Sequence, residues 1–283
     1  MSGLLDLTIV LPVRNEAENL GAALQSIGSD LAQAIVVVDS NSEDDTVKIA
    51  QEHGAHVINF QWNGQFPKKR NWFLREHKPK TKWVLFLDAD EWLTEEFKTE
   101  LRAALADTPH VGFWLNYSIY FLGQPLKGGY PLRKLALFRV GSGEYERIDE
   151  AQWSALDMEI HEHPVLDGST GVIHAKIDHR DMRGPEHWAR KHTEYASWEA
   201  KRYMALANDP AAKHQWSHPQ KIKYRLMGTP LLAPIFFLGC LFAMGGWRDG
   251  KRGVMWARLK AGYFAQVYTR IQQERQKLAK AEN

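Results

Sequence analysis

Two aspartates one residue apart, Asp88 and Asp90, directly follow an apolar run at residues 83–87, and their types and spacing suit metal chemistry. The run WVLFL is short and continuously hydrophobic, which predicts a buried strand. Because alternate residues of an extended segment point the same way, both carboxylates can face one divalent cation. Mg²⁺ or Mn²⁺ that also holds phosphate suits such a small set of oxygen ligands. The pattern predicts a site at the carboxyl end of this strand, where open α/β sheets bind ligands.

The elements around these aspartates alternate between strands and helices. Apolar runs predict strands at 7–13, 34–39, 56–60 and 83–87, and helical spacing predicts helices at 16–27, 46–53, 67–76 and 94–106. Thr94 is expected to cap the last of these helices. This alternation predicts a parallel, doubly wound sheet. Further strands are expected at 111–122 and 132–140, and a helix at 185–206.

The last third of the chain has a different character. Residues 226–247 contain no charged side chain, and Lys and Arg flank them on both sides. Because a single span would carry that excess on one side only, we expect a re-entrant or interfacial hairpin with both ends cytoplasmic. A buried hairpin packed on the catalytic domain is the alternative. Apolar residues then recur every four positions over 255–271, which predicts either a basic amphipathic helix on a membrane surface or an ordinary core helix.

Composition sets broad limits on function. The 283 residues carry a net charge of only +2, so no overall basic field argues for nucleic acid as a partner. A single cysteine, Cys240, cannot build a disulfide framework and favours a reducing compartment. The N-terminal residues lack the basic region of a signal peptide, and none is expected.

Four segments occur in order at plausible spacing: LPVRNEAENL, VVVDSNSEDDT, GQFPKKRNW and FLDADEW. Together they resemble the family 2 glycosyltransferases. That resemblance implies a GT-A fold, an α/β architecture with a doubly wound, Rossmann-like mixed sheet. The apolar and amphipathic segments of the last third add a C-terminal helical membrane-associated extension to this expectation. We expect a catalytic domain at 1–207, and a linker with membrane-associating helices at 208–283. The glycine-rich signatures of dinucleotide and P-loop sites are absent from the sequence.

The resemblance also implies roles for single residues in binding a nucleotide-sugar. Pro12, Asn15 and Glu16 match the loop that contacts the nucleoside, and Asp39 matches the acidic residue that reads the base. Lys69 or Arg70 falls where a basic residue approaches the diphosphate or the ribose. Asp88 and Asp90 match the D-x-D, with Asp90 as the direct metal ligand. Asp88 can contact either the ribose or a metal-bound water. The expected base is uracil, because a carboxylate such as Asp39 can accept a hydrogen bond from uracil N3–H.

The second half more weakly resembles the lipopolysaccharide-core glucosyltransferase branch, through PLRKLALFRV, MEIHEHPVL and a helix that contains KHTEY. An inverting transfer needs a general base for the acceptor hydroxyl. Glu162 matches the family's acidic position, and Glu91 is the second candidate. His179 or His174 is expected to join the metal. We prefer this to a separate zinc site, because no cysteine lies nearby and no H-E-x-x-H occurs.

The sequence therefore predicts an inverting glycosyltransferase that depends on Mn²⁺ or Mg²⁺. It would move a sugar from a UDP-sugar to a hydroxyl of a lipid-linked saccharide, a lipopolysaccharide core or a polysaccharide precursor, at the cytoplasmic face of a bacterial inner membrane. A polyprenyl-phosphate glycosyltransferase is an alternative, and its acceptor phosphate needs no general base. A non-catalytic nucleotide-sugar or membrane-binding module is a third possibility, against which the intact Asp88 and Asp90 argue. A nucleotidyltransferase is disfavoured because the first loop lacks glycines.

Overall fold

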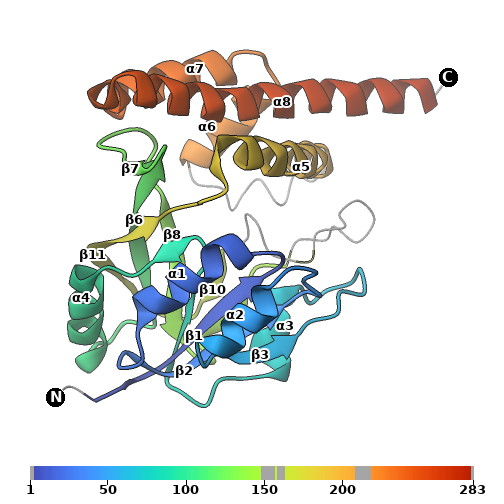
Figure 1. The fold of residues 1–283 in the computed structure, drawn as a ribbon. Helices are drawn as coiled ribbons and strands as arrows, with labels where there is room; N and C mark the ends of the chain where they lie inside the picture. The colour runs from blue at the N-terminus through green and yellow to red at the C-terminus, as the bar shows by residue number, and fades with distance from the viewer. Residues whose placement is uncertain (1–2, 148–156, 158–162, 208–217, 282–283) are drawn as a thin grey trace. The chain divides into compact units, whose positions relative to one another are not determined.

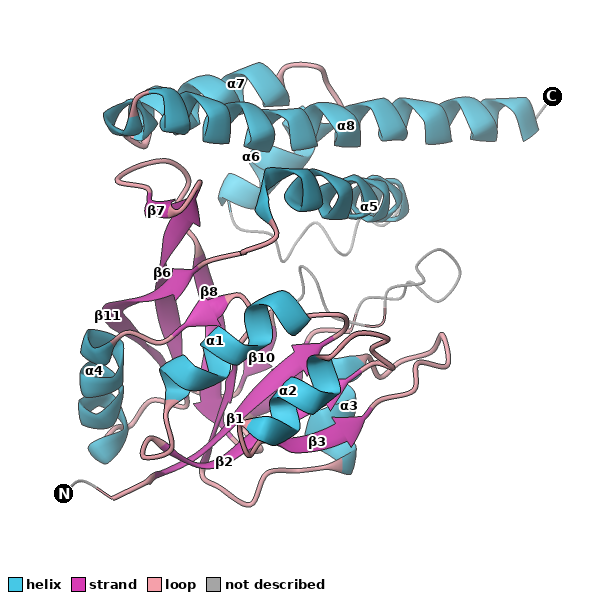
Figure 2. Cartoon of the chain, viewed as in Figure 1, coloured by secondary structure: helices cyan, strands magenta, loops and turns pink. Residues whose placement is uncertain are grey.

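The computed structural model describes residues 3–147, 157, 163–207 and 218–281. The described residues form two compact units. The first contains residues 3–123, 132–147, 157 and 163–182, and the second contains 124–131, 183–207 and 218–281. Figure 1 shows the course of the chain, and Figure 2 shows its helices and strands by type.

The first unit is built on one mixed sheet. Its main path has the strand order β3-β2-β1-β4-β8-β6-β11-β5. The strands are β1 (Leu5–Val13), β2 (Ala32–Asp39), β3 (His56–Asn59), β4 (Trp83–Phe86), β5 (Glu91–Trp92), β6 (Gly112–Phe121), β8 (Arg133–Arg139) and β11 (Thr170–His179). A small second sheet pairs β9 (Gly143–Tyr145) with β10 (Pro164–Leu166), and β7 (Gln124–Pro125) belongs to the second unit.

The expected parallel arrangement is confirmed in the first half of the sheet. β1 lies between β2 and β4 and is parallel to both, and β2 is parallel to β3. The helices that alternate with these strands are α1 (Ala17–Ile27), α2 (Thr46–Glu52), α3 (Lys69–Glu76) and α4 (Glu95–Ala106). Thr94 caps α4 as expected, since its hydroxyl accepts a hydrogen bond of 3.1 Å from the amide of Phe97.

β8 interrupts the parallel order. It runs antiparallel to β4 on one side and to β6 on the other, although β6 and β11 are parallel to each other. The sheet is therefore mixed, as the resemblance implied. This insertion places the beginning of β8, with Lys134, beside the chain that continues from β4 into Asp88.

Hydrophobic side chains cover both faces of the sheet. Leu7, Ile9 and Leu11 of β1 pack in one core with α1 and α4, whereas Val10 packs in a second core with α3. This alternation follows from the two-residue period of a strand, and it requires apolar residues at successive positions. The continuous run that identified β1 in the sequence is therefore a strand buried on both faces.

The second unit is helical. It contains α5 (Gly184–Ala207), α6 (His218–Met227), α7 (Leu232–Leu238), the π-helical turn η2 (Gly239–Ala243), the 3₁₀ turn η3 (Gly246–Asp249) and α8 (Lys251–Ala281). Ala196 and Ala200 of α5 share a core with Val267 and Ile271 of α8. The sequence placed α5 in the catalytic domain that ends at residue 207. The structure instead groups it with the C-terminal helices, because its buried face packs on α8.

The apolar segment at 226–247 folds as part of this helical unit. α7 and α8 are neighbours, and Phe236 packs on Phe264 with ring centroids 4.7 Å apart. Among the helices that the structure describes, none is both long enough and apolar enough to cross a bilayer.

Candidate functional site

The loops that follow β1 and β2 interlock at the carboxyl edge of the sheet. The amide of Asn15 donates to Ser42 Oγ at 2.8 Å, and the amide of Glu43 donates to Asn15 Oδ1 at 2.8 Å. Both Asn15 and Asn41 have φ of 53°, a left-handed conformation that asparagine tolerates better than most residues. The side chain of Asn15 thus joins the two loops. Its predicted contact with the nucleoside stays a prediction.

The first turn of α1 belongs to the same network. The amide of Glu16 donates to Thr46 Oγ1 at 2.8 Å, and its carboxylate accepts from Asn19 Nδ2 at 3.0 Å. Asn19 is fully buried and also bonds Asp181, beyond the end of β11, at 3.3 Å. Sequence reasoning missed Asn19. Its signal is an amide on the apolar stripe of α1, beside Leu20.

Asp39 ends β2 next to the end of β1, where it is in register with Val13. Its side chain is only 3% exposed. The carboxylate accepts from the amide of Ser42 at 3.0 Å and from the Ser42 hydroxyl at 2.5 Å. Each carboxylate oxygen has two lone pairs, so Asp39 keeps acceptor capacity after these two bonds. Pro12, one residue before Val13, lies within β1 at the same edge.

Lys69 and Arg70 are adjacent at the start of α3, but their side chains contact different groups. Lys69 is almost fully buried, donates to the carbonyl of Val13 at 2.9 Å and pairs with Asp157 at 3.3 Å. Burial lowers the pKa of Lys69, against the opposing effect of Asp157. Arg70 instead donates to Asp88 Oδ1 at 2.9 Å. Of the two candidates for the diphosphate, only Arg70 therefore lies beside the D-x-D aspartates.

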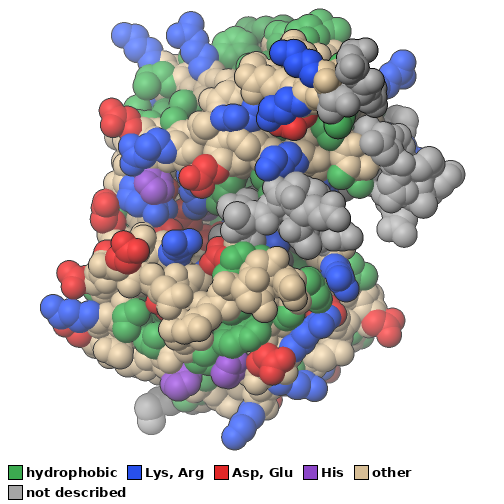
Figure 3. Space-filling model, turned by 90° about the vertical axis from the view of Figure 1, so that its right-hand side faces the viewer, with side chains coloured by type: hydrophobic (Ala, Val, Ile, Leu, Met, Phe, Trp, Pro, Cys, Tyr) green, Lys and Arg blue, Asp and Glu red, His purple; other side chains and the backbone are tan. Residues whose placement is uncertain are grey.

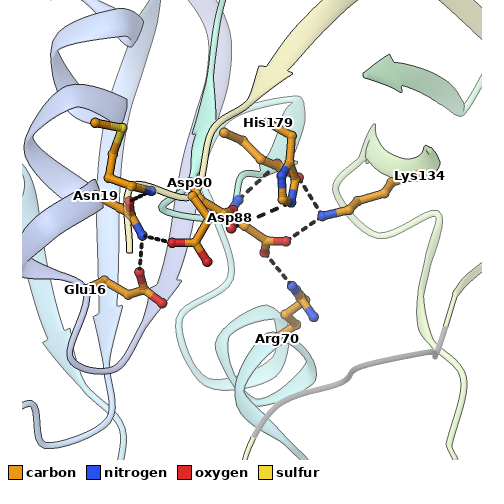
Figure 4. A network of polar contacts seen from close by, with 10 residues as sticks. Glu16, Asn19, Arg70, Asp88, Asp90, Lys134 and His179 are labelled. Carbon is orange, nitrogen blue, oxygen red and sulfur yellow. Dashed lines mark hydrogen bonds and ion pairs between the residues drawn. The ribbon is translucent and has the colours of Figure 1, made fainter. Parts of the chain in front are cut away.

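Asp88 sits between two cations (Figure 4). Arg70 approaches one carboxylate oxygen, and Nζ of Lys134 lies 2.5 Å from the other. Lys134 also lies 2.5 Å from Glu91 Oε1, and the other Glu91 oxygen accepts from the amide of Asp88 at 3.1 Å. Lys134 was missed as a site residue, although it lies within the PLRKLALFRV segment. The available signal was a lysine directly before the apolar residues of a predicted strand.

Burial controls the ionisation of this cluster. Glu91 is fully buried, and burial raises its pKa to about 7 although Lys134 acts in the opposite direction. Burial alone would lower the pKa of Lys134, but the carboxylates of Asp88 and Glu91 outweigh it and hold that pKa well above its usual value. One carboxylate oxygen of Glu91 thus contacts Lys134, and the other accepts a hydrogen bond from the amide of Asp88. The prediction of Glu91 as a general base does not agree with this inaccessible position.

Asp90 faces His179, which lies at the end of β11. β11 pairs with β5 so that His179 is in register with Glu91, and the amide of Arg180 donates to the carbonyl of Asp90 at 2.7 Å. Nε2 of His179 consequently lies 3.6 Å from Asp90 Oδ2. This separation is longer than a hydrogen bond. The structure thus brings together the predicted pair Asp90 and His179.

His174 lies elsewhere. It precedes His179 by five residues on β11, about 16 Å along an extended strand. Its side chain is exposed, and its amide donates to Glu100 of α4 at 2.8 Å. His174 is therefore not positioned to join the same metal as Asp90.

The predicted base Glu162 lies outside the described residues, so its role stays a prediction. In the described part of the chain, no three His, Cys, Asp or Glu side chains are grouped so as to hold a metal ion. The site is thus a pair of possible ligands, Asp90 and His179, beside a charge-balanced aspartate, Asp88.

Comparisons with known proteins agree with this architecture. A family model described as Glycosyl transferase family 2 matches residues 8–157. An uncharacterized glycosyltransferase of Rickettsia felis is 37% identical over 93 residues, which are 33% of this chain and 31% of the relative. The lipopolysaccharide core biosynthesis glycosyltransferase LpsC of Rhizobium meliloti is 26% identical over 273 residues, 90% of this chain and 89% of LpsC.

Coverage differs among the proteins compared. The chain spans about a third of the length of the rickettsial relatives that it matches. Among solved structures, glucosyl-3-phosphoglycerate synthase from Mycobacterium tuberculosis, in complex with Mn²⁺, UDP and glucosyl-3-phosphoglycerate, is similar with a TM-score of 0.32 and 23% identity. That match covers 41% of this chain and 44% of the synthase. The family model, in contrast, spans more than half of the 283 residues, from β1 past the D-x-D aspartates, and the chain belongs to glycosyl transferase family 2.

Proposed function

We propose that this protein is an inverting, metal-dependent glycosyltransferase that moves a sugar from a UDP-sugar to a hydroxyl of a lipid-linked saccharide. The observation that carries the proposal is the pairing of Asp90 with His179, 3.6 Å apart, beside Asp88 at the carboxyl edge of β4. Open α/β sheets bind ligands at this edge. The interlocked loops after β1 and β2 form the adjoining part of the same edge.

The residues present fit a divalent cation. The carboxylate of Asp90 is a ligand type that suits Mn²⁺, and the imidazole of His179 is a nitrogen ligand that binds first-row transition metals. When bound, the cation stabilises the negative charge of the departing diphosphate. Asp90 and His179 would hold it, whereas both oxygens of Asp88 already contact cationic side chains. Asp88 is therefore better placed to orient ribose or a metal-bound water than to be a primary ligand.

The chain's own side chains would bind and orient the donor. Asp39 can accept a hydrogen bond from uracil N3–H with the lone pairs that Ser42 leaves available. Arg70 is held by Asp88 within reach of the same edge, so its guanidinium can approach the diphosphate. The buried Lys69 would act indirectly, because it fixes the carbonyl of Val13 and thereby the loop after β1.

The acceptor half of the proposal rests on other observations. The 26% identity with LpsC extends over 90% of this chain, which supports a saccharide of the lipopolysaccharide core as acceptor. A hydroxyl acceptor needs a base, and the match to the family motif favours Glu162 over the buried Glu91. The reaction would take place at the cytoplasmic face of a bacterial inner membrane, where UDP-sugars and a lipid-linked acceptor can meet.

Asp39→Asn tests how the nucleotide is recognised. We expect its affinity for UDP in the presence of Mn²⁺ to fall at least about tenfold, because the variant replaces a charged acceptor with a neutral amide. Calorimetric titration with UDP, GDP and CDP measures this effect, and the wild type should prefer UDP. Asp45→Asn is the matched control, since Asp45 is exposed in the same loop and makes no side-chain cap bond. Unchanged UDP affinity in Asp39→Asn, or a wild type that prefers another nucleotide, would contradict uracil recognition by Asp39.

A further inference from the structure

The second unit carries an apolar face on α7 and η2, formed by Leu231, which directly precedes α7, and by Ile235, Leu238 and Phe242. These side chains are 54%, 49%, 52% and 62% exposed. Their spacing of four, three and four residues places them along one side of a helix. Trp247, 61% exposed in η3, is a further large apolar side chain close in sequence. A row of large exposed hydrophobic residues on one helical face marks an interaction surface.

The opposite side of the same helix packs against other parts of the second unit. Leu232 and Cys240 are buried, and Phe236 packs between Phe264 of α8 and Tyr130, with centroid distances of 4.7 and 5.6 Å. α7 is therefore already held in the helical unit by one side. The apolar face is the side that this packing leaves exposed to solvent.

The exposed charges of the segment that carries the apolar face have one sign. Residues 221–260 contain eight Lys and Arg side chains and a single acid, Asp249. Asp249 is buried and accepts hydrogen bonds from the amides of Lys127 and Gly128, at 2.9 to 3.0 Å. The exposed charges of this segment are thus all positive, and they include Lys221, Arg225, Arg248, Lys251 and Arg258. Figure 3 shows hydrophobic side chains gathered at the top of the view, with Lys and Arg beside them.

We propose that the apolar face inserts into the surface of an anionic phospholipid bilayer, with α7 lying in the plane of the interface. Amphipathic helices of this kind sink their apolar side about 5–10 Å into the boundary between headgroups and acyl chains. The surrounding Lys and Arg would meet the lipid phosphates, each adding to the attraction. A second copy of the chain is a poorer occupant, because a symmetric contact would bring two basic rims together. The inference rests on the lipid-linked acceptor of the proposed function and specifies the surface that approaches it.

Flotation of the full-length protein with vesicles tests this surface without any donor or acceptor. Vesicles of about 30% phosphatidylglycerol in phosphatidylcholine should bind the wild type, and pure phosphatidylcholine should bind it much less. The double variant Leu238→Ser/Phe242→Ser should lower the partition coefficient at least about tenfold, because both side chains are removed from the inserted face. Lys251→Gln/Arg258→Gln should weaken binding to the anionic vesicles only.

Leu278→Ser is the matched control, since Leu278 is 53% exposed but lies near the far end of α8. It should bind vesicles as the wild type does. Equal vesicle binding by the wild type and Leu238→Ser/Phe242→Ser would overturn the proposal. So would a wild-type dimer that this double variant dissociates, without binding of either protein to vesicles. UDP binding by the same variants provides a separate measurement, so failure of the membrane surface can be distinguished from failure of the donor site.

Discussion

Asp90→Asn is expected to lower the rate of UDP release from the sugar donor at least about a hundredfold, while the protein stays folded. The loss corresponds to about 2.7 kcal/mol of transition-state stabilisation. It follows from the position of Asp90 opposite His179, where an amide cannot supply the negatively charged ligand that a divalent cation prefers. The measurement is the initial rate of UDP release with Mn²⁺ present, using the UDP-sugar that the wild type consumes fastest.

Two comparisons sharpen this result. Asp107→Asn, at an exposed position after α4, is the matched control and should retain the wild-type rate. His179→Ala should also reduce the rate, and the double variant Asp90→Asn/His179→Ala should be little worse than Asp90→Asn, because residues that hold one ion do not act additively. A wild-type rate in Asp90→Asn would remove Asp90 from the site.

Lys134→Met is expected to destabilise the sheet unit by about 2–3 kcal/mol. The substitution leaves the buried carboxylate of Glu91 without its cation, and it removes one of the two cations beside Asp88. Breaking a buried ion pair by removing one partner commonly costs about 3–5 kcal/mol. We expect less here because the side chain of Lys134 is 30% exposed, so water screens part of the interaction.

Urea unfolding followed by near-ultraviolet circular dichroism measures the effect. Lys134→Met/Glu91→Gln should regain part of the lost stability, since the buried charge left by the first substitution is then removed. Lys176→Met, at an exposed position on β11, is the matched control and should change stability by less than about 0.5 kcal/mol. If Lys134→Met unfolds at the same urea concentration as the wild type, the ion pairs do not stabilise this edge of the sheet.

The part of the fold that could be predicted from the sequence is the part with local signals. Strands such as β1 and β4 are continuous apolar runs because both of their faces are buried, so their periodicity is visible without a partner strand. Asp88 and Asp90 were found because two carboxylates at the end of such a run are conspicuous, and Asp39 was found because its segment resembles the family's second signature. In a parallel sheet, the ends of successive strands meet at one edge, which brings these aspartates into neighbouring loops.

Features that depend on distant pairing could not be predicted. Lys134 meets Asp88 and Glu91 only because β8 inserts antiparallel beside β4, and no local pattern specifies that insertion. The choice between Lys69 and Arg70 depends on the rotation of α3, since adjacent helical residues point about 100° apart. Only the structure shows that Lys69 turns to the carbonyl of Val13.

The histidines illustrate the same limit. His174 and His179 belong to one strand and are chemically equivalent in the sequence, but only His179 is in register with β5 beside Asp90. The boundary of the helical unit was also set by tertiary contact, because the buried face of α5 could have packed on the sheet or on another helix. Such packing choices are made between segments far apart in the chain.

Calorimetric titration of the full-length protein with UDP, with Mn²⁺ present and then with the metal chelated, is the most direct test of the central claim. If Asp90 and His179 hold a cation against the diphosphate, UDP should bind with Mn²⁺ and lose at least about tenfold in affinity when the metal is removed. Equal UDP affinity with and without the metal, or no UDP binding under either condition, would contradict a metal-dependent UDP-sugar site at this edge of the sheet.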